Sequence, residues 1–446
     1  MYSISDQINN RRVLIYPEKT TVGRNSNNPF EFNNEKITST YFPEDIDTSV
    51  SDPYFDKVEI GDGNFIYNGD NIQVLKSLPS NSVDSIVTDP PYGLKFMKKQ
   101  WDYDVPSLEL WKECYRVLKP GGYLLSFGSS RTYHRMAVRV EDSGFEIRDQ
   151  IMWIYGSGFP KSHNVGLSID KELGHPDRGH RIATASRVHP DGTIEPNGEV
   201  IPSYVTKSDE AKPWEGWGLN LKPAHEPIVV ARKPISEKNI AKNVLKWNTG
   251  GINVDGCRIE LNENEDISVQ RDGKRILDTL GQGWGFKSVS RGNEGRFPSN
   301  LIFDDVAAEI LDQQSGIIKT RNKLKGTVSS NTGASKFFYC PKPSKKEKEE
   351  GLEFFESASC KEGNKTRKNT HSTVKPLKLM QYLIRLVTPK GGITIDPYFG
   401  SGTSGISTLK EDNNYKFIGI EKEKEYFDIA VARCQFEYEE SLKLAA

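Results

Sequence analysis

Apolar and polar positions alternate in two separate parts of the chain, residues 61–155 and 373–446, with the periods of strands and amphipathic helices. The first part predicts strands at 65–67, 83–88, 123–127 and 145–155, with helices through 74–78, 108–118 and 133–142. The second part predicts helices at 377–387, from 403 and at 424–436, with strands at 393–395 and 417–420. Strands that alternate with helices are typical of an α/β domain, in which helices cover both faces of a parallel sheet.

The regular pattern is interrupted between residues 156 and 372. This segment is rich in Gly, Pro, Asn, Lys and Trp, and it is too long for a single loop within a compact domain. It predicts an inserted region with ordered pieces at 227–231 and 244–247 and an exposed, charged stretch at 342–368. Residues 1–60 are polar and lack periodicity, so we expect an N-terminal arm that is partly disordered.

Composition narrows the class of protein. Of the 446 residues 27% are charged, and 60 Lys and Arg balance 61 Asp and Glu, so no basic excess predicts a nucleic-acid partner. The five cysteines are dispersed, and His134 and His371 have no accompanying ligand set, which argues against a disulfide framework or a metal site. No apolar run reaches membrane-spanning length and no signal-peptide core is present, so we expect a cytoplasmic protein without a membrane partner.

A glycine-rich turn marks a candidate nucleotide site. Residues 400–405 read Gly-Ser-Gly-Thr-Ser-Gly, after a predicted strand and at the start of a predicted helix. Glu421 ends the next predicted strand, where a carboxylate can accept hydrogen bonds from ribose hydroxyls. A dinucleotide-binding domain is one alternative, but only 41 residues follow Gly405. Strands of residues 61–155 must therefore complete the sheet, with the glycine-rich turn last in a permuted order.

A second candidate site is the tetrapeptide Asp89-Pro90-Pro91-Tyr92, which follows the predicted strand 83–88. An ionised Asp89 accepts hydrogen bonds only, and Pro90 keeps its carbonyl acceptor while the two prolines stiffen the loop. Two acceptors suit the two N–H donors of an exocyclic amino group, and Tyr92 can stack on the ring that carries it. A base must leave the duplex to be reached in this way. The alternative is an ordinary proline-containing turn.

Together and in this order, the two motifs resemble the β-class of DNA amino-methyltransferases. The resemblance implies a Rossmann-like methyltransferase sheet with circularly permuted motif order and a large inserted target-recognition region at 156–372. The halves of the domain are then 61–155 and 373–446. It implies that Asp89, Pro90, Pro91 and Tyr92 are catalytic. It also implies that S-adenosylmethionine is bound by Asp70, Thr373, Lys375, Pro376, Asp396, Phe399, Gly400, Gly402, Thr403 and Glu421.

Within the resemblance, residues 373–376 match the segment that contacts the methionine part of the cofactor, and Asp70 matches a position near its adenine. The family commonly has Asp-Pro-Phe at the cofactor turn and His-Pro-Thr before residue 374. This chain has Tyr398 and Ser372 at the differing positions.

The implied function is site-specific methylation of double-stranded DNA at adenine N6, by direct attack of the amino nitrogen on the sulfonium methyl group. Cytosine N4 is the alternative, because both are exocyclic amines; Asp in the first position of the tetrapeptide is most often associated with adenine. A non-catalytic nucleic-acid-binding module and a nucleotide-dependent oxidoreductase are further alternatives. A homodimer and a cognate restriction endonuclease are compatible partners. The insertion contains aromatic and basic residues that could contact DNA, without any one being assigned to a base: Trp214, Trp217, Trp247, Trp284, Lys319, Arg321, Lys323 and Lys325. The alternative, favoured for most of them individually, is solvated charge and aromatic rings of a small core.

Overall fold

The computed structural model describes most of the chain from residue 55 onward. The described residues are 55–94, 102–156, 158, 162–175, 187–188, 194–195, 206–261, 295–316, 319–322, 326–329, 333–339, 347–353, 355, 358–359, 366–371 and 373–445, except 62, 348 and 412. They belong to one compact unit, 51–446. Most of the predicted N-terminal arm, Trp284, Lys323, Lys325 and much of the charged stretch at 342–368 lie outside the described residues.

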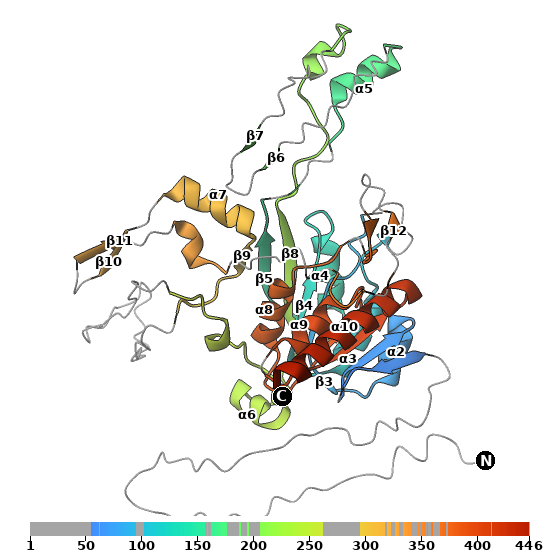
Figure 1. Ribbon diagram of the computed structural model, residues 1–446, viewed down its shortest axis with the longest axis vertical. Coiled ribbons are helices and arrows are strands. Elements are labelled where there is room, and N and C mark those ends of the chain that lie inside the picture. The colour runs from blue at the N-terminus through green and yellow to red at the C-terminus, as the bar shows by residue number, and fades with distance from the viewer. Residues whose placement is uncertain are drawn as a thin grey trace, which may run out of the picture. The chain divides into compact units, whose positions relative to one another are not determined.

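A mixed nine-stranded sheet forms the centre of this unit, in the order β1-β2-β15-β14-β3-β4-β8-β5-β9 (Figure 1). Neighbouring strands are parallel from β2 to β4 and between β5 and β9. In sheet order the strands are β1 (Asp56–Glu59), β2 (Phe65–Asn68), β15 (Lys416–Glu421), β14 (Ile393–Asp396), β3 (Val83–Thr88), β4 (Leu118–Phe127), β8 (His225–Arg232), β5 (Glu146–Ile154) and β9 (Leu301–Phe303).

The expected parallel sheet is wrong at β1 and β8, which run antiparallel to their neighbours. β8 has a topological reason for its direction. The chain leaves the sheet at the end of β5 and returns at the same edge, where Tyr155 N–H donates to the Ala224 carbonyl at 3.0 Å and Ile154 pairs with His225. A chain that re-enters at that edge has to run opposite to β5. Strands β8 and β9 arise from the segment predicted as an insertion, and β1 from the end of the predicted arm.

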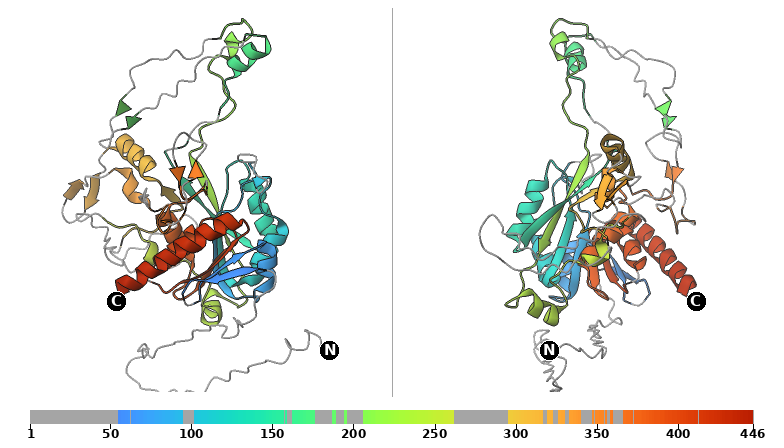
Figure 2. Two further views of the ribbon diagram at one scale, coloured as in Figure 1. Left: turned by 45° about the vertical axis from the view of Figure 1, so that its right-hand side comes forward. Right: turned by 90° about the vertical axis from the view of Figure 1, so that its left-hand side faces the viewer.

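Two layers of helices cover the faces of the sheet (Figure 2). On one face lie α2 (Asn71–Ser77), α3 (Leu108–Val117) and α4 (Tyr133–Asp142); on the other lie α8 (Leu377–Val387), α9 (Thr403–Leu409) and α10 (Lys424–Ala445). Alternate residues of a strand point to opposite faces. In β3, Ile86 packs with the α2–α4 layer and Val87 with the α8 layer. The sheet is therefore buried on both faces, which explains the continuous apolar runs of its central strands.

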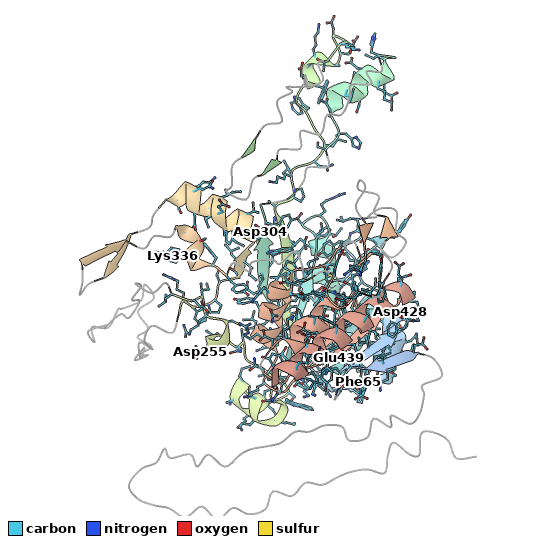
Figure 3. All side chains as sticks on the ribbon, in the orientation of Figure 1. Phe65, Asp255, Asp304, Lys336, Asp428 and Glu439 are labelled. Carbon is cyan, nitrogen blue, oxygen red and sulfur yellow. The ribbon has the colours of Figure 1, made fainter. Side chains whose placement is uncertain are left out.

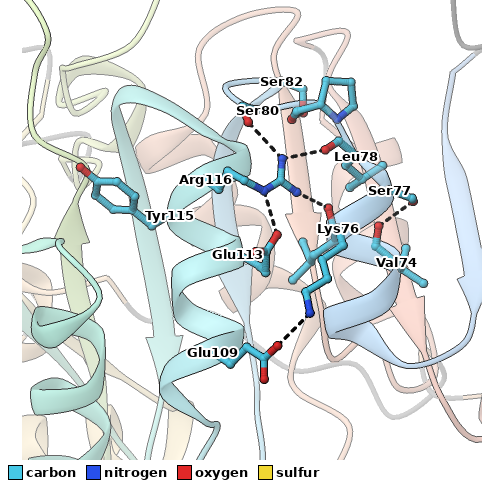
Figure 4. Close-up of polar contacts among 12 residues, drawn as sticks. Val74, Lys76, Ser77, Leu78, Ser80, Ser82, Glu109, Glu113, Tyr115 and Arg116 are labelled. Carbon is cyan, nitrogen blue, oxygen red and sulfur yellow. Dashed lines mark hydrogen bonds and ion pairs between the residues drawn. The ribbon is translucent and has the colours of Figure 1, made fainter. Parts of the chain in front are cut away.

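Polar contacts fix α2 against α3 (Figure 4). The Arg116 guanidinium donates to the carbonyls of Leu75 at 2.6 Å and Leu78 at 2.9 Å, and to Glu113 at 2.8 Å. Lys76 forms an exposed ion pair with Glu109 at 2.8 Å. The Arg116 bonds satisfy carbonyls at the C-terminus of α2, where the last turn of a helix has no partners of its own.

The remaining segment after β5 carries α5 (Val165–Glu172), α6 (Ile240–Trp247), α7 (Asp305–Ser315) and three short turns, η3 (Lys212–Trp214), η4 (Asp255–Cys257) and η5 (Ala334–Phe337). It also carries three two-stranded pairs: β6 (Arg187–Val188) with β7 (Ile194–Glu195), β10 (Lys319–Asn322) with β11 (Gly326–Ser329), and β12 (Ala358–Ser359) with β13 (Thr366–Arg367). Asp304, labelled in Figure 3, caps α7 and accepts from Gly156 N–H at 3.0 Å, which ties α7 to the end of β5.

Candidate active site

The Asp-Pro-Pro-Tyr segment follows β3, at the carboxyl edge of the parallel strands. Open α/β sheets place their ligands at this edge. The buried Asp102 holds the loop by accepting from the backbone N–H groups of Tyr92 at 2.8 Å, Gly93 at 2.9 Å and Leu94 at 3.2 Å. The Thr132 hydroxyl donates to the Tyr92 carbonyl at 2.6 Å. Pro90 is buried and Pro91 is half-buried. The loop is thus fixed by side chains as well as by its prolines.

Four side chains meet beside this loop: Asp89, Tyr92, Glu226 and Lys375. The Tyr92 hydroxyl lies 2.8 Å from Asp89 Oδ1 and 2.8 Å from Glu226 Oε2. The Lys375 ammonium lies 2.6 Å from Asp89 Oδ2, 3.1 Å from the Tyr92 hydroxyl and 3.3 Å from Glu226 Oε2. We refer to these four residues as the acceptor cluster. Its carboxylate side chains keep exposures of 17% at Asp89 and 21% at Glu226, so a ligand can reach them.

Burial and charge set the protonation of the acceptor cluster. Burial, followed by the negative charges of Asp89 and Glu226, raises the pKa of Tyr92 well above its ordinary value, so the phenol stays neutral. Burial pulls the pKa of Lys375 down, but Asp89 and Glu226 outweigh it and the net shift is upward. The cluster therefore contains an ammonium and a neutral phenol between two carboxylates.

The glycine-rich turn follows the neighbouring strand β14. Gly400 and Gly402 have φ of +57° and +83°, a region that favours glycine. A Cβ on Gly400 would lie 2.9 Å from His371 Nε2, and one on Gly402 would lie 3.1 Å from the Ala430 Cα atom. The turn thus needs glycine for both its conformation and its close packing. Thr403 follows as the first residue of α9 and is buried.

Hydrogen bonds to the Asp396 carboxylate hold the start of this turn. Its carboxylate accepts from the hydroxyls of Thr88 and Ser404, both at 2.6 Å, and from Tyr398 N–H at 3.0 Å. Burial raises the pKa of Asp396 to about 6, although the three donors oppose this shift. Because Thr88 immediately precedes Asp89, the contact joins the glycine-rich turn to the acceptor cluster.

Glu421 ends β15 and faces the turn. Its two carboxylate oxygens accept from the backbone N–H groups of Gly400 and Glu423, each at 2.8 Å. Burial raises the pKa of Glu421 to about 7, against the effect of these two donors. An ionised carboxylate has about four lone-pair sites, so acceptor capacity remains for ribose hydroxyls. The geometry of Glu421 fits the predicted role.

The structure brings Asp70 to the same edge, since β2 pairs with β15 and Gly69 N–H donates to the Glu421 carbonyl at 3.0 Å. Asp70 caps α2 by accepting from Ile72 N–H at 3.2 Å. Phe399 is placed differently: its buried ring stacks on Phe417 in the core. Only its backbone can line a ligand at the turn.

Residues 373–376 precede α8, and one of them reaches the acceptor cluster. Thr373 is exposed, and Pro376 occupies the N-cap position of α8 without a side-chain hydrogen bond. Lys375 between them points its ammonium into the acceptor cluster. The resemblance assigned Lys375 to the cofactor; the structure places it against Asp89.

Sequence reasoning missed Glu226 and Asp102. Glu226 stands 134 positions from Tyr92, and no local motif marks it. Asp102 lies in a short irregular stretch before α3. Glu226 stands at the start of β8, and only the antiparallel direction of that strand brings its start to the carboxyl edge of the sheet. The sequence alone does not reveal that direction.

A family model described as a DNA methylase of the N6/N4 type matches residues 83–432, which include both motifs and the strands between them. This chain belongs to that DNA methylase family. Enzymes of the family depend on S-adenosylmethionine, in agreement with the glycine-rich turn and Glu421. The methylase has the α/β fold expected for the family, with Asp89 and Gly400 at the carboxyl edge of one sheet.

The methylase is similar to several named relatives. The type II methyltransferase M.HindIII of Haemophilus influenzae is 24% identical over 83% of this chain and 95% of its own length. M.BglII of Bacillus subtilis is 40% identical over 23% of this chain and 26% of its own. Among solved structures, the M1.HpyAVI–SAM complex has a TM-score of 0.36 at 18% identity over 82% of this chain and 98% of that one. The PvuII cytosine-N4-specific DNA methyltransferase has a TM-score of 0.40 at 14% identity over 86% and 97%.

Across the described ranges, no helix is long and apolar enough to cross a membrane. The same residues contain no group of three or more His, Cys, Asp or Glu that could hold a metal ion.

Proposed function

We propose that this methylase transfers a methyl group from S-adenosylmethionine to the N6 atom of a flipped adenine at a specific sequence in duplex DNA. One observation carries the proposal: the Asp89 carboxylate stands at the carboxyl end of β3, one residue after the Thr88 contact to the cofactor turn. A nitrogen bound at Asp89 therefore lies next to whatever occupies the turn.

The residues of the cofactor half suit an adenosine with a sulfonium tail. Glu421 offers acceptors for ribose hydroxyls, and Gly400 and Gly402 allow close approach of the backbone. We also assign Asp70, Thr373, Pro376 and Thr403 to the cofactor site, as the resemblance implies. S-adenosylmethionine supplies, when bound, an electrophilic methyl group on a sulfonium sulfur.

The tetrapeptide orients the amino group for attack. Asp89 Oδ and the Pro90 carbonyl each accept a hydrogen bond from one of the two N–H groups. These bonds draw the nitrogen lone pair out of conjugation with the ring, so it can attack the methyl group. Tyr92 provides a ring on which the base stacks, for about 1–3 kcal/mol. Extrusion of the base costs a few kcal/mol, so stacking recovers part of that cost.

Adenine is favoured over cytosine because Asp occupies the first position of the tetrapeptide and because the larger purine overlaps more of the Tyr92 ring. The test is digestion of methylated DNA to nucleosides, followed by mass spectrometry. N6-methyl-2′-deoxyadenosine is the expected product. N4-methylcytosine as the sole product would overturn the choice of base and leave the amino-methyltransferase chemistry in place.

Sequence recognition is assigned to the irregular segment after β5. Two of its described aromatic side chains, Trp214 and Trp217, are 42% and 59% exposed and contact each other edge to face at 5.2 Å between ring centroids. Exposed aromatic rings beside lysines suit contacts with bases and phosphates. As further partners we propose a second copy of the chain and a cognate restriction endonuclease. Co-purification and sedimentation test both.

A further inference from the structure

Glu226 brings a second carboxylate to the acceptor cluster from a strand that sequence motifs do not mark. Because β8 runs antiparallel, its first residues lie where the parallel strands end; Phe127, the last residue of β4, pairs with Ile228. Glu226 is consequently level with the loop that follows β3. Its carboxylate contacts Tyr92 and Lys375, at 2.8 and 3.3 Å.

The acceptor cluster has fewer N–H and O–H hydrogens than it has hydrogen-bond contacts. Five close contacts join the four residues: Tyr92 to Asp89 and to Glu226, and Lys375 to Asp89, to Glu226 and to Tyr92. An ammonium supplies three hydrogens and a phenol supplies one. With both carboxylates ionised, one of the two contacts between the Tyr92 hydroxyl and a carboxylate has no hydrogen. The cluster can therefore take up one proton without any change of geometry.

Amino methylation releases one proton. As the nitrogen attacks, the N–C bond forms, the C–S bond breaks with its electron pair leaving on sulfur, and the nitrogen becomes positively charged. It returns to a neutral amine only by losing one of its hydrogens. Asp89 accepts a hydrogen bond from that nitrogen and so receives the proton first.

We propose that Glu226 is the final acceptor of this proton and acts through Tyr92; the inference rests on the proposed amino-methyltransferase function. The protonated Asp89 donates to the Tyr92 oxygen while the Tyr92 hydroxyl donates its own hydrogen to Glu226. Asp89 is again a carboxylate, Tyr92 is again a phenol, and Glu226 is a carboxylic acid. The raised pKa of Tyr92 agrees with a hydroxyl that passes a proton on without remaining a phenolate.

The surroundings of Glu226 limit the groups that can take over its role. Tyr92 and Asp89 face it from the loop after β3, Lys375 from the segment before α8, and Tyr155 from the end of β5. Burial, with Glu226 as the next cause, raises the pKa of Tyr155 to about 12, so Tyr155 stays neutral. Lys375 is already protonated. Glu226 also contributes negative charge that stabilises the positive nitrogen in the transition state.

The experiment measures single-turnover transfer of labelled methyl from S-adenosylmethionine to duplex DNA between pH 5.5 and 9. The variants are Glu226→Gln, Glu226→Asp, Glu226→Ala and Tyr92→Phe. Glu146→Gln is the matched control, because Glu146 is an ion-paired acid on the adjoining strand β5, contacting Arg232 at 2.6 Å. Circular dichroism melts and cofactor binding identify any variant that is misfolded.

Removal of a proton acceptor costs on the order of 10²- to 10⁴-fold. We expect Glu226→Gln to slow transfer by less, about 10- to 100-fold, because Asp89 still accepts the proton from the nitrogen. The affinity for DNA should be unchanged. Glu226→Asp should stay within a few-fold of wild type. Added formate should restore Glu226→Ala, because it supplies the missing carboxylate in the space left by the side chain. If Glu226→Gln is misfolded, Tyr92→Phe carries the same expectation, as it keeps the ring and removes the hydroxyl.

Three results would overturn the inference: a Glu226→Gln rate within twofold of wild type, a loss confined to DNA affinity, or no effect of formate on a folded Glu226→Ala. Each presupposes an active wild type. A wild-type enzyme that transfers no methyl to any DNA would contradict the proposed function instead.

Discussion

The Thr88 hydroxyl donates a 2.6 Å hydrogen bond to the Asp396 carboxylate, across 308 positions of sequence. Both residues are buried at the carboxyl ends of the adjacent strands β3 and β14. This contact joins the strand end to which we assign the amino group to the strand end to which we assign the cofactor. The permuted order of the motifs along the chain does not separate them in space, because β3 and β14 are neighbours in the sheet.

Thr88→Val should weaken both stability and cofactor binding. It leaves the buried Asp396 carboxylate with one donor fewer, which costs about 1–3 kcal/mol. Chemical denaturation and calorimetry with S-adenosylmethionine measure the two effects. Ser85→Ala is the control on the same strand, because Ser85 contacts Thr388 at 2.7 Å, away from the turn. Equal cofactor affinity in the two variants would contradict the role given to Thr88.

Glu421 should make cofactor affinity depend on pH. Ribose hydroxyls donate to a carboxylate, so binding favours the ionised form, and affinity should rise as pH increases through about 7. Glu421→Gln should abolish this rise, and Glu421→Ala should weaken binding about 10- to 100-fold. Calorimetry between pH 5.5 and 8.5 measures both. A pH-independent affinity of the wild type would count against the assignment.

The stability of the protein without cofactor should depend on pH in the opposite direction. The pKa of Asp396 is raised from 3.8 to about 6 and that of Glu421 from 4.5 to about 7, so the folded state binds more protons than the unfolded one. Their contribution is complete below the unfolded values and is lost as pH rises through about 7. Denaturation at pH 5 and pH 8 measures the greater part of this loss, because both folded pKa values lie between these pH limits. In the Glu421→Gln variant, the difference in the free energy of unfolding between pH 5 and pH 8 should be smaller than in the wild type.

Asp89→Ala should fold and bind cofactor but lose methyl transfer. Without the carboxylate, the amino group has no acceptor on that side, and the loss should be on the order of 10²- to 10³-fold. Labelled-methyl transfer measures it. Asp104→Asn serves as control, since Asp104 is an exposed acid paired with Arg139 at 2.8 Å outside the acceptor cluster. Transfer near the wild-type rate in Asp89→Ala would refute the assignment.

An exchange of recognition segments should be restricted to residues 158–222. Strands β8 and β9 lie within 156–372 and belong to the central sheet, so replacement of that whole segment would remove part of the core. With the shorter exchange, a chimera of this chain and a related enzyme should methylate a different sequence with the same chemistry. Methylation-sensitive sequencing detects the change. An unaltered sequence in an active chimera would place recognition in another segment.

Local patterns in the sequence determined the elements that carry the two motifs. The strand at Val83–Thr88 is predicted with the bounds that the structure gives β3. The apolar positions that recur between Leu377 and Val387 predict α8, although the helix ends before the glycines at 391 and 392 that are expected to stop it. The glycines of the turn are also predictable from the sequence, because a tight turn between a strand and a helix limits which residues fit. The N6/N4 family follows from these motifs and their order.

The tertiary structure alone decided how distant residues meet. Glu226 enters the acceptor cluster because β8 runs antiparallel, and that direction depends on where the chain re-enters the sheet rather than on the composition of the strand. Lys375 faces Asp89 because α8 packs on the sheet beside β3, 286 positions away in sequence. Short-range periodicity contains no information on either contact, since both are produced by the packing of helices and strands around a common core.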